Sequence, residues 1–490
     1  MVKIVVTQIG PREHYAVAQA LHQRGMLAGL VTDWYAFGWK SRKQKAESEK
    51  KFQLSAFIIS TFDRLISAFS VSVFQHFGRC GRAALAARCE AIPDALVRAF
   101  LFRSLLWKWR VRRMAARGHT YDGYLETDRA FGVAVARLKL PPHDVFFGYS
   151  YASLEAMVVA QAQGKMTVLC QIDPGPVHFR IVAGEMARHP ALAGPPQPFP
   201  DAYFARSRRE WELADVIVVN SEWTREALIA EGADPNKIEI LPLAYEAEEP
   251  EDRGQRTEDR SQRTEDGSQN AGRALANSEN TDAVLTGMAV GNSAPSGLSS
   301  LSSVLRPPSS APPPLRVLWL GQVTPGKGIH YLMEAARLLE GEPVHFDVVG
   351  SIGIRPAAVA AAPENMTFHG AVSRDRVADW YRQSDVFVLP TLSDGFALTQ
   401  LEALSHGLPV ITTPNCGRVV EDGKTGFIIP PRGAIELAGA ILKFSKERQL
   451  SEAMAPACRA AVKQFSIDTY GDRLVGIVHN HLAAKKLKEP

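Results

Sequence analysis

The 490-residue chain lacks several patterns that would assign a function at once. Its five cysteines are scattered and form no C-x-x-C pair, so they indicate neither a zinc site nor a disulfide framework, and they fit a reducing compartment. No stretch holds the roughly 18 uninterrupted apolar residues that a membrane-spanning helix needs. The first residues, MVKIVV, read as a strand, not as a basic segment before an apolar leader. We therefore expect a cytoplasmic protein.

Charge is nearly balanced over the whole chain but is unevenly distributed. The formal net charge is +4, yet residues 41–118 hold 16 Lys and Arg against 5 Asp and Glu. Apolar and basic residues interleave there, as in LVRAFLFRSLLWKWRVRRMAARG, which predicts an insert of amphipathic helices. Such helices can lie on an anionic membrane surface, and we rank this interpretation ahead of a nucleic-acid patch and level with ordinary surface helices. The alternatives are ordinary surface helices with a solvated basic face and a nucleic-acid patch, although no recognisable nucleic-acid module accompanies it.

Residues 246–314 interrupt the pattern of the rest of the chain. The units DRGQRTE and DRSQRTE follow one another without the apolar positions of a coiled coil, and the stretch SAPSGLSSLSSVLRPPSSAPPP is rich in Ser and Pro. Such a segment buries too little apolar surface to offset the entropy lost on ordering. We predict a disordered linker between two domains, as the chain length also favours.

On both sides of the linker, short apolar runs alternate with helical patterns, which is typical of doubly wound parallel sheets. The predicted strands are 2–7, 29–33, 144–149, 166–172, 215–220 and 237–243 before the linker, and 316–321, 345–350, 365–370, 385–390, 409–413 and 426–431 after it. We predict an α/β fold with Rossmann-like domains at 1–245 and 315–467, followed by a terminal helix at 468–490.

Residues 385–426 carry the strongest functional signal. The strand DVFVLP leads into a turn at Gly395, a predicted helix from Phe396 to His406, and the strand PVITT. A helix that begins at the carboxyl end of a parallel strand can bind an anion. Asp394 lies just before this helix, and Glu402 lies about 9 Å along it at ~1.5 Å per residue. A sugar nucleotide fits this spacing, because its diphosphate lies between two groups that carry hydroxyls.

The segment DGFALTQLEALSHGLPVI resembles the donor-binding segment E-G-F-G-x-x-x-x-E-A-x-A-x-G-x-P-V-I of retaining GT-B glycosyltransferases of the GT4 class, with Asp394 in place of the first Glu. The resemblance implies the GT-B fold, in which two Rossmann-like domains face a cleft. It also implies that Asp394 contacts sugar hydroxyls and that Glu402 contacts the ribose. The other donor-binding residues that it implies here are those of the following turn, namely Gly395, Phe396, Ala397, Leu398 and Thr399.

The stretch GQVTPGKGI at 321–329 is similar to the G-R-x-x-x-x-K-G-x stretch of the same class, whose Arg and Lys hold the donor diphosphate. Gly321 and Lys327 match, whereas Gln322 replaces the Arg. A neutral hydrogen bond is worth roughly 0.5–1.5 kcal/mol and a charge-assisted one roughly 1.5–3 kcal/mol. We therefore expect weaker donor binding unless Arg355 or Arg418 compensates.

The resemblance places the acceptor in the first domain, next to the loop after the first strand. The residues that we assign to acceptor binding are Gly10, Arg12, His14 and Asp173. Glu185 is a further cleft candidate, and for Asp173 and Glu185 a structural role as a turn cap or a surface carboxylate is the alternative.

We assign catalytic roles to Asp394, Lys327 and Tyr149. Many relatives carry a His at the end of the strand equivalent to 144–149, where this chain has Tyr149-Ser-Tyr151. Tyr is a weak acid–base group near neutral pH, which fits a retaining mechanism without a strong enzyme base. No D-x-D, the metal clamp of the other major glycosyltransferase fold, occurs in the chain. We expect neither metal nor cofactor, and we do not expect Cys416 to be a nucleophile.

The predicted function is a retaining glycosyltransferase. It would transfer a sugar from a nucleotide-sugar donor to a lipid-linked or glycan acceptor in cell-surface polysaccharide or glycolipid synthesis, at the inner face of the plasma membrane. Two alternatives are a GT-B sugar-nucleotide epimerase and a non-catalytic scaffold that binds sugar nucleotides. We expect no nucleic-acid partner.

Overall fold

A computed structural model describes residues 1–10, 15–35, 92–246 and 313–488. The described residues up to 246 and those from 315 onward belong to one compact unit. Residues 247–312 of the predicted linker and residues 41–91 of the predicted basic insert lie outside the described part. None of the described helices is long and apolar enough to cross a membrane.

The first sheet has seven strands, all parallel, in the order β3-β2-β1-β4-β5-β6-β7. Their bounds are β1 Ile4–Gln8, β2 Leu27–Thr32, β3 Val97–Ala99, β4 Val145–Tyr149, β5 Met166–Gln171, β6 Val216–Val219 and β7 Ile238–Ile240. The central strands are continuous apolar runs because both faces of the sheet are covered. In β4, for example, Phe146 and Phe147 point to opposite faces and belong to two different apolar clusters.

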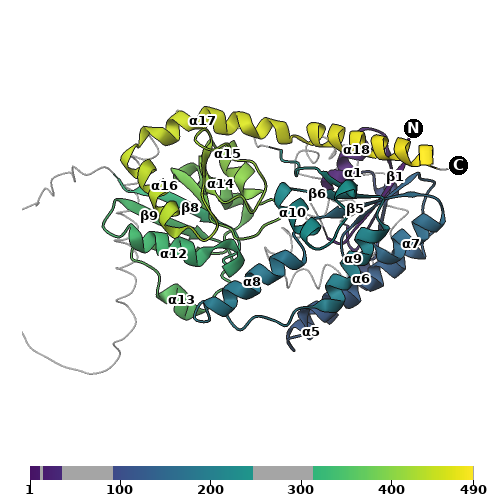
Figure 1. The fold of residues 1–490 in the computed structure, drawn as a ribbon, viewed down its shortest axis with the longest axis horizontal. Coiled ribbons are helices and arrows are strands. Elements are labelled where there is room, and N and C mark those ends of the chain that lie inside the picture. Colours follow the sequence, from purple (N-terminus) through teal and green to yellow (C-terminus); the bar gives the residue numbers. More distant parts are fainter. Residues whose placement is uncertain (11–14, 36–91, 247–312, 489–490) are drawn as a thin grey trace, which may run out of the picture. The chain divides into compact units, whose positions relative to one another are not determined.

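Helices cover both faces of this sheet. The helices of this half of the chain are α1 Ala16–Gln23, α5 Leu101–Ala115, α6 Thr120–Ala136, α7 Leu154–Ala162, α8 Pro176–Arg188, α9 Asp201–Leu213 and α10 Glu222–Ala230, with short 3-10 turns at Asp94–Leu96 and Pro235–Lys237. Helices α6, α7 and α9 lie side by side and contact one another (Figure 1). Phe131 of α6 and Met157 of α7 pack in the same cluster as Phe146. Within the predicted basic insert, the described residues include helix α5, so this part of the insert is helical as predicted.

The second sheet has six parallel strands in the order β10-β9-β8-β11-β12-β13. The strands are β8 Leu315–Leu320, β9 Val344–Val349, β10 Met366–Gly370, β11 Val386–Leu389, β12 Val410–Thr412 and β13 Gly426–Ile428. The helices are α12 Ile329–Leu338, α13 Pro356–Ala360, α14 Arg374–Gln383, α15 Thr399–Ser405, α16 Ala434–Lys446, α17 Gln449–Val462 and α18 Ile467–Lys488, with 3-10 turns η5 Pro325–Lys327 and η6 Lys463–Phe465.

The last helix, α18, packs against α1 of the first half of the chain. Tyr470, Leu474 and Val478 of α18 are buried in the cluster that contains the α1 residues. Arg24, at the end of α1, donates hydrogen bonds to the Asp472 carboxylate and to the Asp468 carbonyl, both at 2.7 Å. The chain therefore returns to its first sheet after completing the second.

In each sheet the strand order reverses once, between β1 and β4 and between β8 and β11. At such a point the connections leave toward opposite faces of the sheet, and their loops diverge at the carboxyl ends of the strands. The loop after β8 contains Lys327, and the loop after β11 contains Asp394. Topology thus brings these two predicted site residues to the same edge of the second sheet.

The predicted helix from Phe396 to His406 was too long at its amino end. Helix α15 begins at Thr399, and residues 395–398 form an irregular turn. Ala397 has φ +62°, which a right-handed helix cannot accommodate, so the helix begins only after it.

Candidate functional site

The loops after β8 and β11 are joined by hydrogen bonds to one carbonyl. The backbone N–H of Leu392 donates to the Gly326 carbonyl at 2.9 Å, and the Thr391 hydroxyl donates to it at 3.2 Å. Gly328 follows with φ +73°, and a Cβ there would lie 1.9 Å from the Pro390 carbonyl oxygen. Only glycine allows the two loops to approach this closely.

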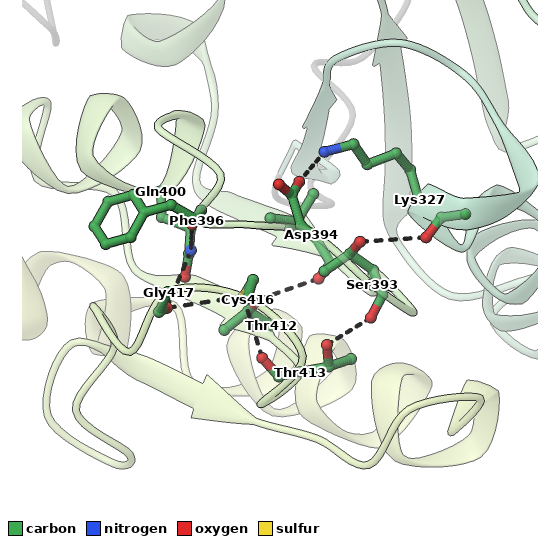
Figure 2. A network of polar contacts seen from close by, with 12 residues as sticks. Lys327, Ser393, Asp394, Phe396, Gln400, Thr412, Thr413, Cys416 and Gly417 are labelled. Atoms are coloured by element: carbon green, nitrogen blue, oxygen red, sulfur yellow. Dashed lines mark hydrogen bonds and ion pairs between the residues drawn. The ribbon is translucent and has the colours of Figure 1, made fainter. Parts of the chain in front are cut away.

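Lys327 and Asp394 form an ion pair across these two loops, and Figure 2 shows the two side chains pointing at each other. The Lys327 side chain keeps 30% of its surface exposed and the Asp394 side chain 16%. Burial lowers the pKa of Lys327 to about 8, whereas its contact with the Asp394 carboxylate favours the ammonium form. Lys327 is therefore mainly charged at neutral pH.

The turn at 395–398 is held in an unusual backbone conformation. Ala397 is one of four non-glycine residues with positive φ in the described part of the chain, and such a conformation costs roughly 1–2 kcal/mol. Gly395 approaches the backbone of the first half of the chain, because a Cβ there would lie 2.3 Å from the Ile172 carbonyl oxygen. Asn220 donates a hydrogen bond to the same carbonyl at 2.9 Å. Backbone strain of this kind is typical of ligand-binding turns.

Residues 413–417 support the turn from below (Figure 2). The Asp394 N–H donates to the Asn415 carbonyl at 2.9 Å, and the Gly417 N–H donates to the Phe396 carbonyl at 3.1 Å. The Asn415 side chain donates to the Leu392 carbonyl at 2.8 Å. This loop therefore fixes the backbone that positions Asp394.

Cys416 lies within this supporting loop and is 1% exposed. Burial raises the pKa of its thiol to about 11. A protonated, enclosed thiol is a poor nucleophile, in agreement with the expectation from the sequence.

Glu402 lies on α15, and one of its carboxylate oxygens is already engaged. The buried Tyr381 of α14 donates its hydroxyl proton to Glu402 Oε2 at 2.7 Å. The Tyr381 ring stacks on His406, with centroids 5.1 Å apart. Burial and the Glu402 charge raise the pKa of Tyr381 well above its ordinary value, so the hydroxyl keeps its proton. This contact orients the carboxylate and leaves Oε1 for a ligand.

The structure does not supply an evident substitute for the arginine that Gln322 replaces. Gly321 adopts φ +155° after β8, and the Gln322 side chain is exposed. Arg355 is exposed next to the start of α13, and its backbone N–H donates to the Leu192 carbonyl. Arg418 is 68% exposed and lies 4.0 Å from Glu226. Neither guanidinium contacts Lys327 or Asp394 in any recorded interaction of the described residues.

The residues predicted for the acceptor side are only partly described. Arg12 and His14 lie outside the described residues. Gly10, with φ +74°, donates its N–H to the Asp33 carboxylate at 2.8 Å. Asp173 follows β5 and accepts hydrogen bonds from the Tyr151 hydroxyl at 2.7 Å and from the Gly175 N–H at 2.8 Å.

The two tyrosines after β4 differ in position. Tyr149 is 2% exposed and belongs to an apolar cluster of the first sheet, and its catalytic role stays a prediction. Tyr151 instead reaches Asp173, and its ring stacks on Tyr203 with centroids 4.6 Å apart. Tyr151 also has positive φ, +74°.

A buried carboxylate holds Tyr151 in this conformation. Glu210 of α9 accepts the backbone N–H groups of Tyr151 at 2.6 Å, Ser153 at 2.8 Å and Leu154 at 3.0 Å. Arg206 donates to the Tyr151 carbonyl at 2.7 Å. Burial raises the pKa of Glu210 to about 7. Sequence reasoning missed this group, because nothing in the spacing of α9 distinguishes a buried Glu from a surface one.

Residues of α8 and α10 also reach the loops after β8 and β11, and sequence reasoning assigned them no role. Trp223 of α10 donates its indole N–H to the Ser393 hydroxyl at 3.1 Å. His178 of α8 faces the Ser393 backbone, Lys327 and Asp173. The proline and glycine just before His178 signal a helix start, but only the fold brings that helix to the η5 turn.

Glu185 is fully buried and is surrounded by donors. Its carboxylate accepts from Arg188 at 2.6 Å, from Arg432 at 2.8 Å and from the Tyr331 hydroxyl at 2.9 Å, and His330 Nε2 lies 3.1 Å away. Burial acts to raise the pKa of Glu185, but these hydrogen bonds outweigh it and lower the pKa to about 2. Glu185, His189 and His330 have metal-like spacing, yet the two guanidinium groups already neutralise the carboxylate. The cluster is therefore best explained as a structural ion-pair network.

Residues 314–447, about a quarter of the chain, match the family model described as Glycosyl transferases group 1. A D-inositol 3-phosphate glycosyltransferase of Streptomyces griseus is 31% identical over 194 residues, which are 36% of this chain and 40% of that protein. The alpha-D-kanosaminyltransferase of Streptomyces kanamyceticus is 27% identical over 171 residues, which are 33% of this chain and 44% of that protein. The chain thus spans less than half the length of the curated relatives it matches.

Two solved structures resemble the whole fold. Sucrose-phosphate synthase from Thermosynechococcus elongatus has a TM-score of 0.55 at 15% identity, over 99% of this chain and all of that chain. HepE of Anabaena in complex with UDP has a TM-score of 0.52 at 14% identity, over 98% of this chain and all of that chain. The fold is GT-B, as predicted, and the similarity to group 1 glycosyltransferases is confirmed for residues 314–447.

Proposed function

We propose that this protein is a GT-B glycosyltransferase that moves a sugar from a nucleotide-sugar donor to a lipid-linked or glycan acceptor, with retention of the anomeric configuration. The observation that carries the proposal is the Lys327–Asp394 pair, at the strand-order reversal of the second sheet and within the segment that matches the group 1 glycosyltransferases. Relatives named as glycosyltransferases and the HepE complex with UDP support a nucleotide-sugar donor. Cell-surface polysaccharide or glycolipid synthesis on the cytoplasmic side is the setting that we propose.

In the proposed reaction, the bond between the anomeric carbon and the diphosphate breaks, and a bond from that carbon to an acceptor oxygen forms. The departing diphosphate gains negative charge, which the Lys327 ammonium and the amides of residues 395–398 would stabilise. The acceptor hydroxyl's proton passes to the departing phosphate. Asp394 would bind a hydroxyl of the donor sugar, and Glu402 Oε1 would bind the ribose. We propose that this charge stabilisation uses no metal or other cofactor.

On the acceptor side we propose the loop after β1 together with Asp173. Asp173 is held in place by the Tyr151 hydroxyl and the Gly175 N–H, so its carboxylate is positioned before any ligand binds. Gly10 contributes through its backbone, because its φ of +74° turns the chain after the end of β1.

We also propose that α5 contacts an anionic membrane surface, where a lipid-linked acceptor would be found. Leu105, Leu106 and Trp109 of α5 are 55%, 64% and 56% exposed. The same helix carries five basic residues and no acidic one, and Arg113 lies over the Trp109 ring. An exposed apolar and basic helical face is typical of interfacial helices. Co-sedimentation with vesicles should increase with the fraction of anionic lipid, and indifference to lipid charge would refute this part.

One feature favours a second candidate, a scaffold that binds sugar nucleotides without turnover. Lys327 is already paired with Asp394, and Gln322 adds no positive charge. A donor must therefore compete with Asp394 for the ammonium group.

The test is a donor panel of UDP-, GDP- and ADP-sugars, incubated with membrane lipid extract and with EDTA in a parallel set. Transfer of radiolabelled sugar to lipid or glycan, unaffected by EDTA, is the expected result. NMR of the product should show the anomeric configuration of the donor. Binding of a donor without any transfer would favour the scaffold. Inversion at the anomeric carbon would refute only the retaining mechanism and would leave the glycosyltransferase proposal standing.

A further inference from the structure

The ionised side chains of the proposed donor site do not balance a diphosphate. Among the described residues of the donor-side loops, Lys327 is the one cation beside Asp394, and the acceptor-side Asp173 adds a second carboxylate near them. The diphosphate of a nucleotide sugar brings about two further negative charges near neutral pH, and bringing like charges together in a partly buried site is unfavourable. Gln322 offers a hydrogen bond but no charge. A further positive charge beside the diphosphate would strengthen donor binding.

His178 is placed to do so. His178 is the third residue of α8. It packs against the η5 turn, because a Cβ added to Gly326 would lie 3.8 Å from His178 Cε1. The imidazole faces Asp173 at the end of β5, Lys327 in η5 and the Ser393 backbone in the loop that leads to Asp394. It therefore lies among both donor-side loops and the end of β5.

One nitrogen of this imidazole is without a partner. His178 Nδ1 is buried and has no hydrogen-bonding partner among the described residues. A buried polar atom in that state is unfavourable unless a ligand completes it. Nine buried side-chain atoms in the described residues lack a hydrogen-bonding partner. Of these, His178 Nδ1 belongs to the residue that faces both Lys327 and Asp173.

We propose that His178 is a donor-contacting residue, whose imidazole hydrogen-bonds a diphosphate oxygen and takes up a proton when the nucleotide sugar binds. This inference rests on the proposed function, because it takes the 321–328 and 391–398 loops to be the donor site. The proton uptake changes the imidazole from neutral to cationic and so provides the second positive charge that Gln322 does not supply.

The titration of the free site agrees with this role. Burial lowers the pKa of His178 below 6.5, Lys327 lowers it further, and Asp173 and the Ser393 backbone act in the opposite direction. The ring is therefore neutral near pH 7 in the free protein. A bound diphosphate places negative charge beside both His178 and Lys327, and this raises the pKa of each. Lys327 is already charged below pH 8, so uptake at pH 6–7 would come from His178.

The experiment is isothermal titration calorimetry of the full chain with UDP-glucose, GDP-mannose and ADP-glucose, in buffers that differ in ionisation enthalpy. These donors have no phosphate group that titrates near neutrality, so the buffer dependence reports protons taken up by the protein. For a donor that binds, we expect uptake of about half a proton or more per site at pH 6.5. We expect His178→Gln to abolish that uptake and to weaken binding about tenfold at pH 6.5, but less at pH 8.5.

His119→Gln is the matched control, because the His119 side chain is 64% exposed at the start of α6 and, in the described part of the chain, pairs with Asp122 alone. It should leave both uptake and affinity unchanged. Should His178→Gln fail to fold, His178→Asn and the buffer dependence of the wild-type chain still decide the question. Donor binding without proton uptake at pH 6–7, or uptake that persists in the His178 variant, would overturn this inference and leave the proposed function standing. Failure of every donor to bind would overturn both.

Discussion

The carboxylate of Glu210 offers the sharpest test of how this site is built. It accepts three backbone N–H groups, at 2.6, 2.8 and 3.0 Å, and it holds Tyr151 at a φ of +74°. That conformation costs roughly 1–2 kcal/mol for a residue with a side chain. Without Glu210, the turn after β4 would lose the bonds that oppose this strain, and the Tyr151 hydroxyl would no longer be fixed against Asp173.

The substitution Glu210→Gln keeps the shape of the side chain but replaces one acceptor oxygen by an NH2 group. This group is a donor and cannot accept a backbone N–H, so at least one buried N–H loses its partner. An unsatisfied buried donor costs about 1–3 kcal/mol. For a domain of about 150–250 residues, 1 kcal/mol shifts Tm by roughly 2–4 °C, so we expect Tm to fall by about 2–12 °C.

The pH dependence gives an independent check. Burial raises the pKa of Glu210 to about 7 in the folded protein, from 4.5 for a Glu that is not buried. The folded state therefore binds the proton more tightly than the unfolded state, and the contribution of Glu210 to stability decreases as pH rises from about 4.5 to about 7. The Gln variant lacks this titration, so the difference in Tm between the two proteins should be larger at pH 5 than at pH 8.

Glu212→Gln is the matched control on the same helix, because the Glu212 side chain is 59% exposed and forms only a surface pair with Arg209. It should change stability by less than about 0.5 kcal/mol. Thermal unfolding followed by circular dichroism measures both variants. If Glu210→Gln matched the control at both pH values, Glu210 would not hold the turn, and the reasoning would be refuted.

Four further predictions concern the donor side of the site. Lys327→Met should weaken donor binding by about 10- to 100-fold in calorimetry, because it removes a charge-assisted contact worth roughly 1.5–3 kcal/mol; unchanged affinity would remove Lys327 from the donor site. Tyr381→Phe should raise the donor KM several-fold with little change in kcat, since it frees Glu402 from its orienting hydrogen bond, and an effect confined to kcat would contradict this. Gln322→Arg should tighten donor binding about tenfold, and no gain would show that position 322 does not face the diphosphate. Cys416 should resist alkylation by iodoacetamide in the native protein at pH 8, because its pKa is raised to about 11, and rapid labelling detected by mass spectrometry would be the contrary result.

The overall fold could be predicted from the sequence because its signals are local. Runs such as VKIVVT and DVFVLP are short, rich in β-branched residues and bounded by turn residues, which favours strands buried on both faces, and Gly and Ser mark the turns between strands and helices. The expected start of the helix at Phe396 was wrong for a reason that periodicity cannot reveal. The apolar pattern continues through Ala397, but the backbone there is left-handed, because the loop at 413–417 and the Ile172 carbonyl constrain it.

The residues that we propose for the donor side, Lys327, Asp394 and Glu402, could be singled out from the sequence, since they lie in contiguous motifs whose spacing along the chain is itself the signal. Their partners were not. Tyr381, which orients Glu402, comes from a helix 21 residues earlier, and its role depends on the crossing of α14 and α15.

The sequence by itself determined the alternation of strands and helices. It also determined the two motifs that contain Lys327 and the Asp394–Glu402 pair, because such patterns depend on neighbours along the chain. The tertiary structure alone decided which charges meet. It paired Lys327 with Asp394, buried Glu210 beneath Tyr151, and placed His178 against both donor-side loops. The physical reason is that burial and the distance between charges set each pKa, and neither quantity can be read from residue order.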